Sequence, residues 1–148
     1  MKKYLLIFTV LFALGCGHVN FDPPSEFIEK SKTSERLVLV SSDASRIRLS
    51  WRENTKNGTH KFWSNLMKRE LTTFKGYKLT NTEEYKSNAT IMEFTPPPLY
   101  KDYIYTVAVM TNDDDLYILE LGCETSAYAE KKKSFLSLLK KVYSKEIN

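Results

Sequence analysis

Two stretches of this chain carry the period of an amphipathic helix, and they limit what the rest of it can form. In the first, residues 60–74, apolar side chains recur every three or four positions, and Thr59 before it is a suitable N-cap. Gly76 stands where such a helix commonly ends. A second helix is expected over residues 127–144. Each apolar stripe has to be buried, so the chain must supply a surface for two helices.

The other patterned segments are typical of β-strands. Residues 46–52 alternate, with Ile47, Leu49 and Trp51 on one face and mostly arginines on the other. A period of two directs the first set to the core and the second to solvent. Further strands are predicted at residues 37–40, 77–80, 89–94, 103–110 and 116–121. The predicted element order is ββαββββα.

Neither helix can bury its stripe except against the sheet. We therefore expect an α+β domain, a two-layer sandwich in which two amphipathic helices pack on a largely antiparallel sheet. This order resembles the PsbP-like fold, which includes small periplasmic lipoproteins of the DcrB type. The resemblance covers about residues 36–144, and depends on the element order, on residues 103–110 followed by 116–121, and on the closing helix. It implies an accessory protein without enzymatic activity, because that fold hosts mostly such proteins.

The N-terminus has the form of an export signal. Lys2 and Lys3 precede an apolar run, Tyr4–Leu14, that ends at Gly15-Cys16. At about 1.5 Å per residue this run would span roughly 16 Å of a hydrocarbon layer about 30 Å thick, so we expect it to be cleaved. Residues 13–16 resemble the lipobox of bacterial lipoproteins, in which the cysteine is diacylated and becomes the first residue. The same residues also fit ordinary secretory cleavage, which would leave Cys16 unmodified.

These features divide the chain into three parts. We predict a signal peptide over residues 1–15, a lipidated N-terminus and flexible tether over residues 16–34, and one α+β domain over residues 35–148. Acyl chains on Cys16 would anchor the protein in a bilayer. The residue after Cys16 is Gly17. An Asp at this position would resemble an inner-membrane retention signal. Its absence favours the outer membrane, with the domain facing the periplasm or the cell surface.

Charge argues against a nucleic-acid partner. The chain has 22 Lys and Arg against 18 Asp and Glu, a net charge of +4. Loss of Lys2 and Lys3 with the leader lowers this value by two. Proteins that bind nucleic acid usually carry a more concentrated basic charge. The expected partners are the lipid bilayer, through Cys16, and an unidentified envelope protein.

Few residues suggest catalysis. The histidines are His18 and His60, and the cysteines are Cys16 and Cys123. Cys123 and His60 could form a nucleophile–base pair, although burial of Cys123 at the end of an apolar strand is the competing interpretation. If Cys16 is not lipidated, a Cys16–Cys123 disulfide is a further alternative. The sequence contains no phosphate-binding loop and no hydrolase or metalloprotease motif, so we predict neither enzyme nor cofactor. The alternatives are an exported enzyme that uses Cys123 and His60, and a carrier that holds a small molecule between sheet and helices.

One acidic stretch and one proline-rich stretch are candidate binding features. Asp113–Asp115 lacks the spaced acidic pattern of a calcium loop, so we predict a solvated hairpin tip and no metal site. Pro96–Pro98 form a stiff connection beside several tyrosines, and tyrosine is common in interfaces. Packing of these tyrosines on the sheet rim is the alternative. The candidate partner-binding residues are Pro97, Leu99, Tyr100 and Tyr103.

Overall fold

A computed structural model describes residues 20–100 and 102–147 of the protein. The predicted signal peptide, Cys16 and His18 lie outside these residues. Within them, the order of elements is βββαββββα. The bounds are β1 Ile28–Lys32, β2 Arg36–Val40, β3 Arg46–Glu53, α1 His60–Arg69, β4 Lys78–Tyr85, β5 Ala89–Thr95, β6 Tyr103–Thr111, β7 Asp115–Glu124 and α2 Tyr128–Val142.

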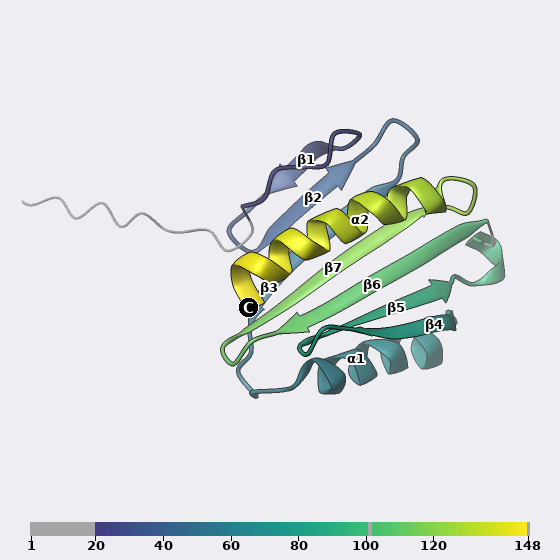
Figure 1. Cartoon of the computed structure of the whole chain (residues 1–148). Coiled ribbons are helices and arrows are strands. Elements are labelled where there is room, and N and C mark those ends of the chain that lie inside the picture. Colours follow the sequence, from purple (N-terminus) through teal and green to yellow (C-terminus); the bar gives the residue numbers. More distant parts are fainter. Residues whose placement is uncertain (1–19, 101, 148) are drawn as a thin grey trace, which may run out of the picture.

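The strands form one sheet in the spatial order β1-β2-β3-β7-β6-β5-β4, and every neighbouring pair is antiparallel (Figure 1). Hairpins connect most neighbours, whereas β3 and β7 meet although α1 and three strands separate them in the sequence. The predicted α+β class, the antiparallel sheet and the two amphipathic helices are confirmed.

The two helices pack on opposite faces of the sheet. Along β6, Ala108 and Met110 join the core under α2, whereas Val107 and Val109 join a second core that contains Leu71, just beyond α1. The sheet therefore lies between two helical layers, and the predicted two-layer arrangement is corrected to three. An apolar stripe shows that a helix needs a surface, but it does not show which face of the sheet provides it.

The predicted tether is wrong for the part of it that the structure describes. β1 pairs with β2, and Phe21 and Phe27 are buried in the core under α2. All five residues of β1 are exposed, since it is a short edge strand. A strand of this kind shows no apolar alternation, so the sequence pattern could not reveal it. The domain therefore begins before residue 28, and not at residue 35.

The ends of α1 follow the sequence prediction. The Thr59 hydroxyl accepts a hydrogen bond from the backbone N–H of Phe62, as expected of an N-cap. A π-helical turn, Glu70–Phe74, extends the helix, and Gly76 then adopts a left-handed φ of 72°. This φ suits glycine because it has no Cβ to clash with the backbone.

Candidate binding surface

The sheet face opposite α2 is only partly covered. The core on this side gathers residues of β4 to β7 under α1 and its π-helical extension, whereas β1 and β2 contribute nothing to it. Beyond α1, a groove of about 410 Å³ lies on this face. We call it the arginine groove, and it is lined mainly by Lys30, Arg36, Val38, Arg46, Arg48, Glu120 and Gly122.

Strand register places the lining residues of the arginine groove. Arg46 of β3 is opposite Gly122 of β7, and Tyr105 of β6 is opposite Gly122 from the other side. Two pairs further along, on the same face of the sheet, Arg48 faces Glu120. A Cβ built at Gly122 would meet no atom of the described residues within 4 Å, so this glycine leaves open space between Arg46 and Tyr105. At Gly122 the floor of the groove is therefore bare backbone.

The Glu120 carboxylate binds two of the side chains that line the groove, Arg48 and Tyr105. Glu120 is 6% exposed, and it accepts hydrogen bonds from the Nη2 of Arg48 at 2.6 Å, from the Nε of the same arginine, and from the Tyr105 hydroxyl. The hydrogen bond to Glu120 raises the pKa of Arg48, and burial together with Glu120 raises the pKa of Tyr105. The carboxylate thus holds both side chains in fixed positions.

Two other arginines of the groove remain available for a partner. Within residues 20–100 and 102–147, the guanidinium groups of Arg36 and Arg46 form no ion pair, and both residues are exposed. The groove thus has four cationic side chains, counting Lys30 and Arg48, and one carboxylate that is already occupied. Its charge is complementary to an anionic ligand.

A second groove continues from the first. This tyrosine groove, of about 380 Å³, is lined by Tyr77, Pro96, Tyr100, Tyr103 and Ile104, and it shares Tyr105 and Gly122 with the arginine groove. Tyr77 and Tyr105 pack with ring centroids 5.5 Å apart. The two grooves together form one surface, which is basic at one end and aromatic at the other. We call it the open sheet face.

The candidate residues from the sequence lie at the tyrosine end of this surface. Tyr100 and Tyr103 line the groove and are 56% and 41% exposed, and Leu99 beside them is 82% exposed. Pro97 is half-buried, and its ring would lie 3.6 Å from a Cβ built at Gly76. Their role in binding stays a prediction. Sequence reasoning missed the arginines as a site, although the alternation over residues 46–52 had placed them on the outer face.

The structure does not bring Cys123 and His60 together. Cys123 is fully buried under α2 near the end of β7, whereas His60 begins α1 on the other face, close to the β6–β7 turn. Asp115 and Cys123, near opposite ends of β7, are eight residue steps apart, which corresponds to roughly 26 Å. Burial, with a smaller effect from Asp43, raises the pKa of the Cys123 thiol to about 11. The proposed nucleophile–base pair is therefore wrong.

His60 lines a different, polar pocket at the start of α1. Its Nε2 is buried and has no hydrogen-bond partner among the described residues, and burial lowers the pKa of its imidazole. Hydrogen bonds within the neighbouring β6–β7 turn stabilise it. The Asn112 side chain accepts hydrogen bonds from the backbone N–H groups of Asp114 and Asp115 at 3.0 and 2.6 Å. In the part of the chain that the structure describes, no three His, Cys, Asp or Glu residues are grouped as metal ligands would be.

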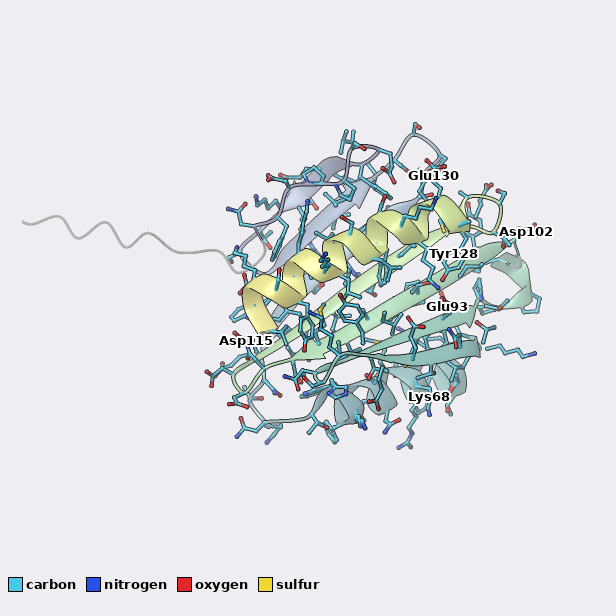
Figure 2. All side chains as sticks on the ribbon, in the orientation of Figure 1. Lys68, Glu93, Asp102, Asp115, Tyr128 and Glu130 are labelled. Carbon is cyan, nitrogen blue, oxygen red and sulfur yellow. The ribbon has the colours of Figure 1, made fainter. Side chains whose placement is uncertain are left out.

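The α2 face carries polar contacts that join helix to sheet. Figure 2 shows Tyr128 of α2 beside Glu93 of β5. Lys132 is 2.6 Å from the Glu93 carboxylate, and the Thr106 hydroxyl donates to the Tyr128 hydroxyl at 3.1 Å. Burial and the hydrogen bond to Glu93 raise the pKa of Tyr128. These groups bind one another, which gives them a structural role.

Comparison with known proteins identifies the fold and no more. No protein-family model matches the sequence, and no curated protein sequence does. The solution structure of cyanobacterial PsbP (CyanoP) from Synechocystis sp. PCC 6803 is similar, with a TM-score of 0.55 and 16% identity over 79% of this chain and 81% of that one. A crystal structure from Bacteroides thetaiotaomicron VPI-5482 has a TM-score of 0.41 and 11% identity, over 76% of this chain and 41% of that one.

The first of these neighbours defines the class of structure. The chain has a PsbP-like fold, as its element order had predicted. At 16% identity this likeness establishes the architecture without the function. Among the described residues, neither helix combines the length and the apolar character needed to cross a bilayer.

Proposed function

We propose that this protein is a bacterial lipoprotein, anchored in a membrane through Cys16, whose domain binds another envelope protein and catalyses no reaction. The open sheet face is the observation that carries the proposal. It presents arginines and exposed tyrosines in adjoining grooves, and these residue types are enriched in protein interfaces. The one nucleophile–base pair suggested by the sequence is held apart by the fold.

Two further observations support this proposal. The leader ends in residues that resemble a lipobox, and the fold is similar to that of cyanobacterial PsbP. Exposed apolar side chains also gather at the tyrosine end, where Leu99, Tyr100 and Tyr103 follow one another closely. An uncovered group of this kind commonly marks an interaction site. The outer membrane, facing the periplasm or the cell surface, remains the proposed location.

Anchoring is tested by replacing the lipidated thiol. Cys16→Ser should block lipid attachment and move the protein from the membrane fraction to the soluble fraction of the native host. Mass spectrometry of the mature wild-type protein should show an acylated Cys16 as the first residue. An unmodified first residue, or a retained leader, would contradict the lipoprotein proposal.

Binding is tested by photo-cross-linking in living cells. A benzoylphenylalanine residue at Tyr103 should form one discrete cross-linked product with an envelope protein. The matched control places the same probe at Lys133, which is exposed on α2 at the other face of the sheet. Equal cross-linking at both positions, or no cross-linking at Tyr103, would contradict the proposed binding role of the open sheet face.

A further inference from the structure

We propose that the arginine groove binds an extended acidic segment of the partner protein, with carboxylates on alternate residues facing Arg46, Arg48 and Arg36. This inference rests on the proposed function and specifies its ligand. It follows from the spacing of the cationic side chains, from the open floor at Gly122, and from the tyrosines that continue the groove.

The spacing of the arginines suits an extended peptide. Arg46 and Arg48 lie on one face of β3, two residues apart, which corresponds to roughly 6.7 Å. Arg36 pairs with Ser50, the next residue on that face of β3, and so continues the row on the neighbouring strand. Alternate side chains of an extended segment have the same repeat, because they point to the same side. Glutamates at alternate positions can therefore meet successive arginines.

The chemistry of the groove favours carboxylates. Arg36 and Arg46 are exposed and form no ion pair within the described residues, so their guanidinium groups can bind a carboxylate through two parallel hydrogen bonds. Arg48 gives two of its five N–H donors to Glu120 and so has further donors to offer a ligand. Because Glu120 fixes its position, Arg48 loses little conformational freedom on binding.

Gly122 gives the peptide backbone room to approach. Nothing lies within 4 Å of a Cβ at this position, and Arg46 and Tyr105 stand on either side. The two grooves, of about 410 and 380 Å³, are each within the range of about 300–1,000 Å³ that is usual for ligand sites. A segment of a few residues fits there, with its acidic part over the arginines and an apolar part beside Tyr100 and Tyr103.

A membrane surface is the less suitable occupant of the groove. Anionic headgroups are usually met by clustered, flexible lysines, and α2, at the opposite face of the sheet, carries five lysines, whereas the arginine groove is lined by one, Lys30. The groove instead combines arginine with tyrosine, the residues that dominate protein hot spots. We therefore assign the groove to a protein segment.

The test uses the purified full-length protein and a fluorescein-labelled heptapeptide, Tyr-Glu-Ser-Glu-Ser-Glu-Tyr. Fluorescence anisotropy in 50 mM NaCl should show saturable binding that weakens at 500 mM NaCl. The same peptide with glutamine in place of glutamate should bind at least tenfold more weakly. Arg46→Glu should cost tenfold or more in affinity, and Gly122→Leu should do the same by filling the floor.

Lys133→Glu is the matched control, since it makes the same change in net charge on the exposed face of α2 and should leave affinity within twofold. Circular dichroism melts of each variant establish that it is folded, and Arg46→Gln provides a milder replacement. Equal affinity of Arg46→Glu and Lys133→Glu would overturn the inference, as would an absence of peptide binding. Arg46-dependent binding of phosphatidylglycerol vesicles or of an oligonucleotide, without peptide binding, would also overturn it. In each case a Tyr103 cross-link that persists shows that the proposed binding function itself stands.

Discussion

The two faces of the sheet differ most clearly along the single strand β7. On the α2 side, Leu119, Leu121 and Cys123 are fully buried in a continuous apolar core. On the other side the strand passes from Ile118, near α1, to Glu120 and Gly122 in the arginine groove. One face therefore stabilises the fold along its whole length, whereas the other is covered for part of its length and open along the rest. Substitutions that compare the two sides of the sheet can test this division.

Phe27 and Ile28 give the largest expected contrast. Phe27 is 3% exposed in the core under α2, and the Nζ of Lys131 lies 5.4 Å from its ring centroid, whereas Ile28 is 69% exposed. Phe27→Ala should lower the free energy of unfolding by about 3–5 kcal/mol, as for other buried phenylalanines. Ile28→Ala should change it by less than about 0.5 kcal/mol. Urea denaturation measures both free energies of unfolding. If the two substitutions have equally small effects, residues 20–34 behave as the tether that the sequence predicted.

Leu39 and Val38 repeat the test on β2. Leu39 is fully buried against the α2 side, and Val38 is half-buried in the arginine groove. Leu39→Ala should cost about 2–5 kcal/mol, since it leaves a cavity in a closed core. Val38→Ala should cost less than about 1 kcal/mol, because solvent already reaches its side chain. A comparable loss for both variants would mean that the two faces contribute equally to stability.

Cys123 reports on the closed face through its reactivity. Burial raises its pKa from 9.0 to about 11, so at pH 8 about one thiol in a thousand is ionised in the native protein, against about one in ten when unfolded. Labelling with a thiol-specific reagent should therefore be at least about 100-fold slower in buffer than in guanidinium. The folded protein should lose stability as pH rises from 9 towards 11, since the unfolded thiol ionises first. Fast native labelling at pH 8 would show that this face is open.

Glu120 gives the smallest change in this series. Its removal leaves the Tyr105 hydroxyl, which is half-buried, without its partner, whereas Arg48 is exposed enough to bind water. Glu120→Ala should cost about 1–3 kcal/mol in urea denaturation. Glu83→Ala, at an exposed position of β4, is the control and should have almost no effect. If Glu120→Ala is as mild as this control, Glu120 does not organise the arginine groove.

Local patterns were sufficient to predict most elements of the fold. The apolar stripe at residues 60–74 shows the period of a helix, and the alternation through Ile47, Leu49 and Trp51 shows the period of a strand. Thr59 and Gly76 mark the ends of the first helix. β1 could not be predicted in this way, because an edge strand exposed on both sides has no period. The placement of the helices on opposite faces also depends on how the strands are connected, which a stripe does not encode.

The arginine groove depends on contacts that are distant in the sequence. Arg48 and Glu120 are 72 positions apart and become neighbours only because β3 pairs with β7. The alternation predicted correctly that the arginines face outward, but it treated them as a solvated face. A glycine that is unremarkable within an apolar segment becomes the floor of a groove once Tyr105 and Arg46 lie on either side of it. The tyrosines, by contrast, are close together in the sequence and were recognised there.

Burial of Phe21 has a geometric consequence for an acylated Cys16. Phe21 follows Cys16 by five positions, and five residue steps of fully extended chain reach at most about 18 Å. If Cys16 carries the acyl chains, Phe21 stays within that distance of the headgroups, so the near side of the domain lies close to the membrane that holds the anchor. A protein that this side of the domain binds must then be embedded in the same leaflet or must itself come to that surface.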